Sequence, residues 1–254
     1  MKKVPLHTHL IGKGSPVVFL HGFLEDSTMW HDVISTFPKN QLVFLDLPGH
    51  GKSPSYELDA YSMKFMAEKV DEALCITNIE NPVVIGHSMG GYVGLELFKI
   101  RKLDKLILFN SNFWEDSKER IQNRNRVIEV VQNNKLVFLN EAIRNLFYIE
   151  NEFTLNTIQD LVCRAKEMEE IDIVRSTKGL RDRLNNSDFV KNHANKITIV
   201  QAENDPIIPL EQMVLNIEQL EKKPKFHLVE NSGHMSVWEN LKATKRILTA
   251  IISN

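Results

Sequence analysis

The sequence has few cysteines, little net charge and no long hydrophobic segment. Its two cysteines, Cys75 and Cys163, fall in helix-like stretches, which favours a reduced cytoplasmic chain with two small core residues over a disulfide. The formal net charge of −2 gives no long-range attraction for nucleic acid or an anionic membrane. No apolar run approaches the ~18 residues that span a bilayer, and residues 1–14 lack the apolar segment of a signal peptide. We therefore expect a cytoplasmic protein that binds neither nucleic acid nor membrane.

The sequence also lacks internal repeats, low-complexity tracts and any Cys, His and carboxylate cluster at metal-ligand spacing. We accordingly expect no metal and no organic cofactor. What remains is ordinary for a globular protein: 254 residues, 43% of them hydrophobic and 25% charged. Such a chain suits one α/β domain with an insertion and can bury a deep pocket. Monomer and homodimer both stay open.

Short apolar runs followed by turn signals recur along the chain and predict strands. They lack strict alternation, which is typical of strands covered on both faces. Most are separated by segments with helical spacing, such as residues 61–78. This order predicts an α/β fold with a mainly parallel sheet flanked by helices, and residues 5–12 read as an antiparallel edge strand. The six runs are 16–22, 42–49, 82–88, 106–111, 197–205 and 226–234.

The strand rhythm stops between residues 112 and 192. Residues 120–139 and 155–173 both have helical spacing there, and in the second Ile158, Leu161 and Val162 lie on one apolar face. We expect residues 1–111 and 193–254 to form the core. Residues 112–192 then form a helical cap, inserted after the sixth strand.

A glycine-rich turn joins a predicted strand to a predicted helix at Gly86-His87-Ser88-Met89-Gly90. The pattern Gly-x-Ser-x-Gly is that of a nucleophile elbow, which holds a serine in a strained backbone conformation. Side chains two residues before and after the serine would collide with the neighbouring strand and helix, so both positions are glycine. Ser88 is therefore the candidate nucleophile.

A serine hydroxyl needs a base, and the base needs an orienting acid. Of nine histidines, His234 is best placed, because it follows the last predicted strand on a glycine-marked loop. Asp205 follows the preceding strand, and Glu203 is the second candidate acid. Parallel strands deliver these loops to one edge of the sheet, so the three side chains can meet. His87 is expected to support the turn rather than act as the base.

In this order the motifs FLHGF (19–23), DLPGHGKS (46–53), GHSMGG (86–91), AENDPIIP (202–209) and SGHMSVWE (232–239) resemble capped α/β-hydrolases similar to bacterial carboxylesterases. The chain order Ser88, Asp205, His234 is the one of that family. The resemblance implies an oxyanion hole made by the backbone N–H groups of Phe23 and Met89. It also implies a small-molecule ester as substrate, cleaved through an acyl-enzyme.

The cap is expected to roof an apolar pocket for a small or medium acyl group. Three alternatives stay open: a carbon–carbon bond hydrolase, a perhydrolase with the same triad, and a slow-turnover sensor that binds a ligand. Carbon–carbon hydrolases of this fold usually carry a cap arginine that faces the serine. The candidate pocket residues are Phe113, Trp114, Phe138, Phe147 and Met235.

Overall fold

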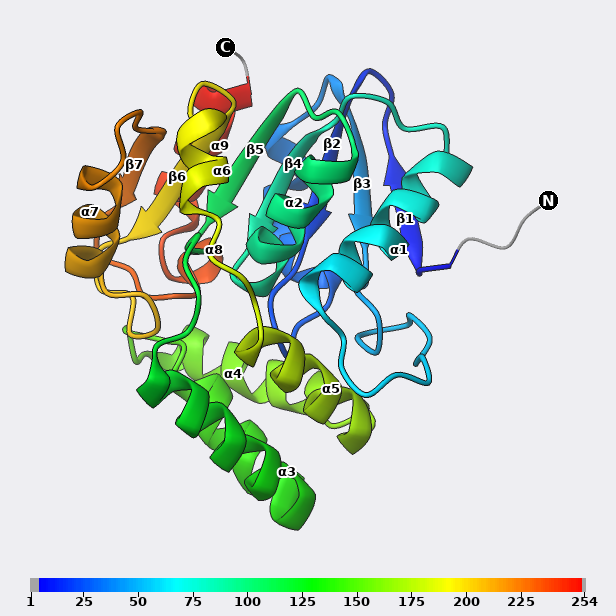
Figure 1. Ribbon diagram of the computed structural model, residues 1–254, viewed down its shortest axis with the longest axis vertical. Coiled ribbons are helices and arrows are strands. Elements are labelled where there is room, and N and C mark those ends of the chain that lie inside the picture. Colours follow the sequence, from blue (N-terminus) through cyan, green and yellow to red (C-terminus); the bar gives the residue numbers. More distant parts are fainter. Residues whose placement is uncertain (1–4, 253–254) are drawn as a thin grey trace.

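The computed structural model describes residues 5–252 and is built on a seven-stranded sheet of order β1-β3-β2-β4-β5-β6-β7 (Figure 1). Strands β2 to β7 are parallel, and β1 pairs antiparallel with β3 at the edge. This confirms the predicted α/β class and the edge strand. The strands are β1 Thr8–Ile11, β2 Ser15–Leu20, β3 Asn40–Leu45, β4 Val83–His87, β5 Lys105–Phe109, β6 Ile197–Ala202 and β7 Lys225–Val229. The helices are η1 Ser27–Thr36, α1 Met63–Ile76, α2 Met89–Ile100, α3 Lys118–Arg144, α4 Glu152–Ala165, α5 Glu170–Arg181, α6 Ser187–Asn192, α7 Leu210–Glu218, α8 Ser236–Glu239 and α9 Leu241–Ile252.

Helices cover both faces of the sheet, which explains why the apolar runs do not alternate. In β2, Val18 and Leu20 face the core that α1, α2 and α7 complete. Val17 and Phe19, which alternate with them, face the core completed by η1 and α9. A strand buried on both sides has no polar face to give an alternating pattern.

The cap lies between β5 and β6, so the expectation that it follows the sixth strand is wrong. The antiparallel edge strand and four parallel strands precede the cap in the described residues, so the cap follows the fifth strand. Helices α3, α4 and α5 lie beyond the carboxyl ends of the parallel strands (Figure 1). The fourth inserted helix, α6, packs against the core instead, where the Phe189 ring lies 5.5 Å from that of Phe98 on α2.

The predicted cap helices exist, but their limits differ. The predicted helix 155–173 is two helices, because α4 ends at Ala165 and α5 begins at Glu170. Helix α3 continues past residue 139 and carries a kink at Asn134 (φ −156°, ψ 80°). The Asn134 side chain accepts a hydrogen bond from the N–H of Val137, as the cap of a new helix does.

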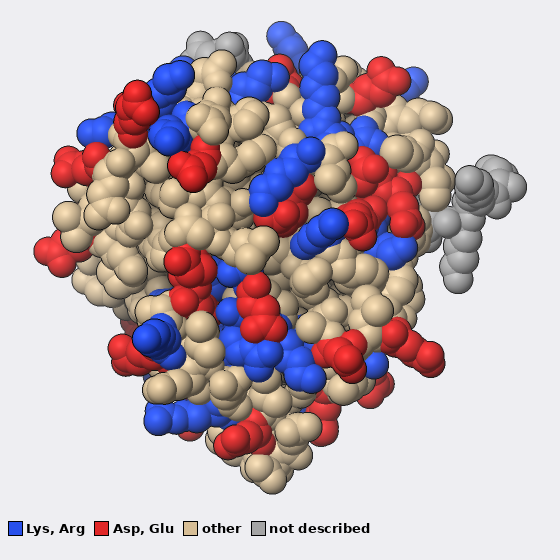
Figure 2. All heavy atoms as spheres, in the orientation of Figure 1, with Lys and Arg blue, Asp and Glu red and all other residues tan. Residues whose placement is uncertain are grey.

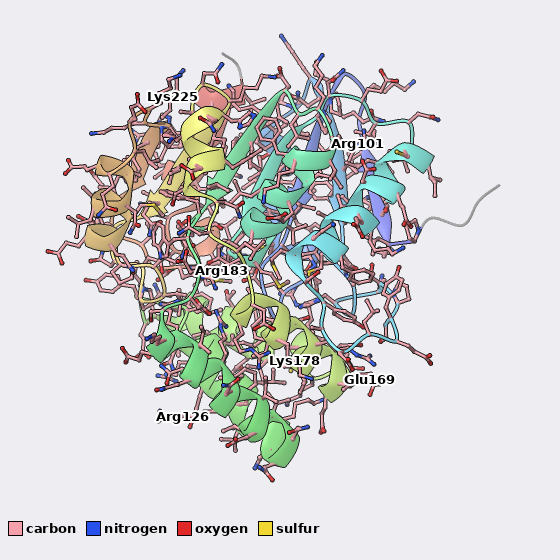
Figure 3. All side chains as sticks on the ribbon, viewed as in Figure 1. Arg101, Arg126, Glu169, Lys178, Arg183 and Lys225 are labelled. Atoms are coloured by element: carbon pink, nitrogen blue, oxygen red, sulfur yellow. The ribbon has the colours of Figure 1, made fainter. Side chains whose placement is uncertain are left out.

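A buried ion-pair cluster ties the two ends of the cap together. The Asp116 carboxylate, in the link from β5 to α3, lies 2.6 Å from Arg183 after α5 and 3.2 Å from Arg124 on α3. The Arg183 guanidinium also sits 4.5 Å from the centre of the Tyr92 ring on α2. Figure 3 shows Arg183 where the cap meets the core. These contacts fix how the cap sits over the sheet edge.

Both cysteines are free and exposed, so the expectation of two core cysteines is wrong. The apolar stripes of α1 and α4 are completed without them, by residues such as Val70 and Leu161. No helix within residues 5–252 is long and apolar enough to cross a bilayer. Acidic and basic side chains are interspersed over the face in Figure 2, which shows no continuous basic surface there.

Candidate active site

Ser88 occupies the sharp turn between β4 and α2, with φ 47° and ψ −114°. A side chain at Gly86 would place its Cβ 2.3 Å from the Gly90 carbonyl oxygen, and one at Gly90 would come within 2.5 Å of the Leu20 carbonyl oxygen. Both glycines are therefore required by close packing, as the sequence pattern predicts. The Ser88 N–H donates to the Phe109 carbonyl (3.1 Å), which anchors the turn to the end of β5.

Asp205 and His234 are brought together at the same edge of the sheet. The Nδ1–H of His234 donates to Oδ2 of Asp205 over 2.8 Å, and both side chains are buried. The other carboxylate oxygen accepts the backbone N–H groups of Ile207 (2.8 Å) and Ile208 (2.9 Å). Since Nδ1 carries the proton, the Nε2 lone pair of His234 is left to act as a base. The contact between this nitrogen and the Ser88 hydroxyl stays a prediction.

Glu203, the second candidate acid, faces away from this pair. It is exposed, and its carboxylate accepts the backbone N–H of Asn231 over 2.8 Å. It therefore stabilises the loop after β7. It makes no hydrogen bond to the imidazole of His234.

The backbone of His234 is held on both sides, by residues that the sequence analysis did not assign to the site. Its N–H donates to the carbonyl of Leu146 in the cap (3.1 Å). Its carbonyl accepts from Nδ2 of Asn110 (2.7 Å) and from Nε2 of His87 (3.0 Å). His87 in turn contacts Glu25 through Nδ1 at 3.0 Å. His87 thus links Glu25 to the loop that carries His234.

Of the two backbone groups expected to form the oxyanion hole, that of Met89 lies at the start of α2 and that of Phe23 lies in the loop after β2. Met89 is the first residue of α2, so its N–H has no partner four residues earlier in the helix. Phe23 follows β2, next to Gly22, whose N–H donates to the Glu25 carboxylate over 2.7 Å. Their joint role as oxyanion donors stays a prediction.

The loop after β3 is held by hydrogen bonds of Asp46, within the loop and to the start of η1. The Asp46 carboxylate accepts the N–H groups of Ser27 (2.8 Å) and Lys52 (2.9 Å), and the Ser53 hydroxyl donates to the Asp46 carbonyl. Burial, reinforced by the electrostatic effect of nearby His21, lowers the pKa of His50 to about 4. His50 is thus neutral near pH 7. These contacts indicate that the polar residues of this loop stabilise its conformation.

Residues 15–241 match the family of the alpha/beta hydrolase fold. The chain belongs to this family. Its fold is similar to that of a thermophilic esterase from Thermogutta terrifontis, with a TM-score of 0.87, 24% identity, and 98% of this chain and 93% of that one covered.

Two curated relatives show how far the sequence likeness extends. A putative esterase/lipase 2 of Mycoplasma genitalium is 25% identical over 231 residues, which are 85% of this chain and 81% of the relative. The AB hydrolase superfamily protein YisY of Bacillus subtilis is 31% identical over 113 residues. That match spans only 42% of the length of each of these two chains.

The aromatic and methionine residues expected to line this hydrolase-fold pocket separate into two groups. Phe138, Phe147 and Met235 pack in one apolar cluster beneath the cap, together with Leu24. Phe113 instead packs in the core on the α1 and α2 face, and Trp114 packs against that core. The first group includes Met235, next to His234, whereas Phe23 packs against both clusters.

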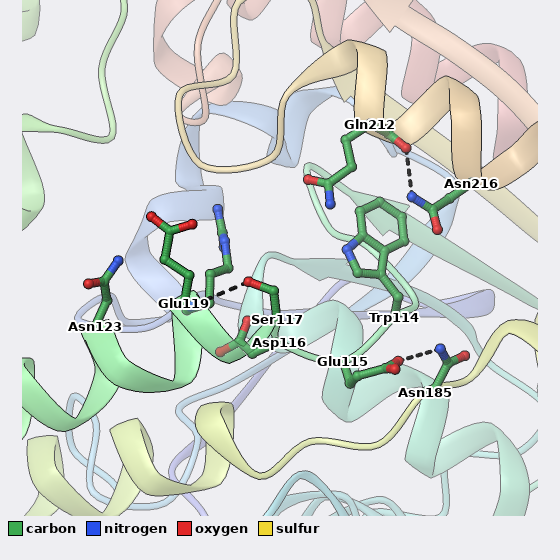
Figure 4. Close-up of a pocket in the computed structure, with 10 residues that line it drawn as sticks. Trp114, Glu115, Asp116, Ser117, Glu119, Asn123, Asn185, Gln212 and Asn216 are labelled. Carbon is green, nitrogen blue, oxygen red and sulfur yellow. Dashed lines mark hydrogen bonds between the residues drawn. The ribbon is translucent and has the colours of Figure 1, made fainter.

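Trp114 lines a different cavity, a polar pocket of about 630 Å³. Figure 4 shows its indole ring between Gln212 and Asn216 of α7 on one side and the start of α3 on the other. Ser88, Asp205 and His234 are not among the residues that line it. The pocket is therefore not the expected acyl site.

Within residues 5–252, no three His, Cys, Asp or Glu side chains converge in a way that would hold a metal ion.

Proposed function

We propose that this protein is a serine esterase that hydrolyses small or medium acyl esters through a Ser88–His234–Asp205 triad. The observation that carries the proposal is the 2.8 Å bond from Nδ1 of buried His234 to Asp205, at the sheet edge where Ser88 occupies a strained turn. The esterase-like fold supports the same reading.

In the proposed reaction, Ser88 Oγ attacks the ester carbonyl while Nε2 of His234 takes its proton. The Asp205 carboxylate stabilises the imidazolium that forms. The N–H groups of Phe23 and Met89 hold the oxyanion, and each such donor is typically worth about a hundredfold to a thousandfold in rate. His234 then protonates the leaving alcohol, an acyl-enzyme remains, and water activated by His234 releases the acid and frees Ser88.

The acyl group is proposed to lie against the apolar cluster below the cap. Phe138, Phe147 and Met235 are each at most 8% exposed, and Phe23 packs against the same cluster. An apolar wall next to the oxyanion loop suits an acyl chain better than a charged one. The proposed mechanism uses no metal and no organic cofactor.

A carbon–carbon bond hydrolase would need a cap arginine that faces the serine. Each cap arginine is already hydrogen-bonded to another protein group, which favours ester hydrolysis. Within residues 112–192 these are Arg120, Arg124, Arg126, Arg144, Arg164, Arg175, Arg181 and Arg183.

The test is a panel of p-nitrophenyl esters of increasing acyl length, with Ser88→Ala and a control, Ser35→Ala, at an exposed serine. We expect the highest kcat/KM at acetate to hexanoate, no turnover by Ser88→Ala, and unchanged activity in the control. A single stoichiometric release would indicate the sensor, and activity restricted to vinylogous diketones would indicate the carbon–carbon hydrolase. Turnover by Ser88→Ala would refute the proposal.

A further inference from the structure

Glu25 and His87 form a buried pair that the proposed reaction does not use. Oε2 of Glu25 lies 3.0 Å from Nδ1 of His87, and the two side chains are 3% and 0% exposed. The pair sits directly beside the proposed machinery, because His87 precedes Ser88 and its ring centre is 4.9 Å from that of His234. Two ionisable groups with almost no access to water have to stabilise one another.

The hydrogen-bond partners determine which atoms of His87 carry protons. A carbonyl oxygen only accepts, so Nε2, 3.0 Å from the His234 carbonyl, must carry hydrogen. Nδ1 faces a carboxylate, and the ordinary pKa of imidazole is about 2 units above that of a glutamate carboxyl. The proton they share therefore belongs on Nδ1. His87 then has hydrogen on both nitrogens and is an imidazolium, and Glu25 is its carboxylate partner.

The pair touches three separate loops. Glu25 accepts the N–H of Gly22 over 2.7 Å, next to the proposed oxyanion donor Phe23. His87 is part of the nucleophile turn, and its Nε2–H holds the carbonyl of His234. The fit is close, since a Cβ on Gly22 would lie 2.8 Å from both carboxylate oxygens of Glu25 and from Nδ1 of His87. A shift of either side chain would thus reach all three loops.

We propose that Glu25 and His87 are positioning residues, a carboxylate–imidazolium pair that locks the oxyanion loop, the nucleophile turn and the histidine loop into one arrangement. The positioning role rests on the proposed esterase function; the protonation state does not.

The electrostatic surroundings agree with the assignment. Burial opposes both charges, but the charge and hydrogen bond of His87 outweigh it and lower the pKa of Glu25. The charge and hydrogen bond of Glu25 likewise raise the pKa of His87, and the His234 carbonyl and the Asp205 charge act in the same direction. His21 is a further titratable neighbour that acts electrostatically on Glu25.

The first experiment measures the imidazole ¹⁵N and ¹H resonances of the wild-type protein at pH 8, about 1.5 units above the ordinary pKa of histidine. We expect His87 to show hydrogen on both ring nitrogens and to keep it there. A neutral His87 at this pH would overturn the ion pair, whether or not the protein hydrolyses esters.

The second experiment compares Glu25→Gln with Glu57→Gln, an exposed glutamate used as the control. We expect Glu25→Gln to lower kcat by about tenfold to a hundredfold, the usual effect of a small misplacement. KM should change by less than about threefold, because substrate contacts remain. The His87 ring should lose its second proton, and the His234 ring resonances should move. Wild-type kcat and unmoved His234 resonances would overturn the positioning role.

Two provisions keep these tests decisive. If Glu25→Gln does not fold, Glu25→Asp keeps the charge but withdraws the carboxylate by one methylene, and the same loss of kcat is expected. If the wild-type protein hydrolyses no ester, the proposed function fails by itself. The resonances of His87 and His234 in wild type and variant then support or refute the pair.

Discussion

Replacing Asp205 with asparagine should trap His234 in the wrong tautomer. Oδ1 of Asp205 accepts the N–H groups of Ile207 and Ile208, at 2.8 and 2.9 Å, and Oδ2 faces His234. In Asp205→Asn, the amide oxygen has to take the place of Oδ1, because only an acceptor satisfies two N–H groups. The amide NH₂ then points at Nδ1 of His234. That nitrogen becomes an acceptor, and the proton moves to Nε2, where it blocks uptake of the Ser88 proton.

The expected loss is large because the substitution removes both the base and the charge that stabilises the imidazolium. An equivalent change in a serine protease lowers kcat about 10⁴-fold, which corresponds to about 5 kcal/mol of activation free energy. We expect a loss of this size for Asp205→Asn in p-nitrophenyl butyrate hydrolysis. Circular dichroism checks that the fold persists.

Glu203→Gln is the matched control, since Glu203 lies two residues away and pairs with the N–H of Asn231 instead. We expect it to keep activity within about threefold of wild type. The assignment of the orienting acid would be refuted if Asp205→Asn retained more than a tenth of wild-type kcat. It would also be refuted if Glu203→Gln lost more of its kcat than Asp205→Asn.

Three further changes test packing and charge. Gly22→Ala forces a Cβ to 2.8 Å from Glu25 and His87, so it should cost about 1–3 kcal/mol of unfolding free energy in urea, as overpacking does; wild-type stability would contradict this. The lowered pKa of Glu25 stabilises the fold above its ordinary value of 4.5, and the raised pKa of His87 stabilises it below 6.5. The stability difference between wild type and Glu25→Gln should therefore be largest at pH 4.5–6.5. It should shrink as the pH falls through the folded pKa of Glu25 or rises through that of His87, and a pH-independent difference would disprove the pair. Asp116→Asn leaves Arg183 facing a neutral partner where the carboxylate was 2.6 Å away, and should cost about 3–5 kcal/mol in the same assay; a cost below about 1 kcal/mol would show that this junction is not stabilised by the ion pair.

The sheet and the nucleophile turn could be predicted because strict local rules produce them. Strands such as Ser15–Leu20 are covered on both faces, so residues 17–20 appear as an unbroken apolar run. Gly86 and Gly90 are glycine because any side chain would meet backbone atoms at 2.3–2.5 Å. Such constraints can be recognised in a single sequence.

The contacts around His234 could not be predicted in the same way. Glu25 and His87 are 62 residues apart, and no spacing rule links an acid after one strand to a histidine at the end of another. Asn110 has a positive φ of 43°, and its side chain donates to the His234 carbonyl. Asparagine tolerates this backbone conformation, but its presence in a sequence does not predict it.

The packing of the predicted pocket residues could not be foreseen for a related reason. Phe113 and Phe138 are both buried aromatic residues of the inserted segment, but one packs on the sheet side and the other under the cap. Hydrophobicity predicts burial and does not identify the partner. The single helix expected over 155–173 failed similarly, because the break between α4 and α5 contains neither glycine nor proline.

The most direct test of the central claim is covalent labelling with diethyl p-nitrophenyl phosphate, followed by intact mass and peptide mapping. A serine activated by a neighbouring imidazole should take up one diethylphosphoryl group, at Ser88, with release of one p-nitrophenol. His234→Ala should abolish the reaction, and Glu203→Gln should not. Labelling at another residue, or undiminished labelling of Ser88 without His234, would contradict the account.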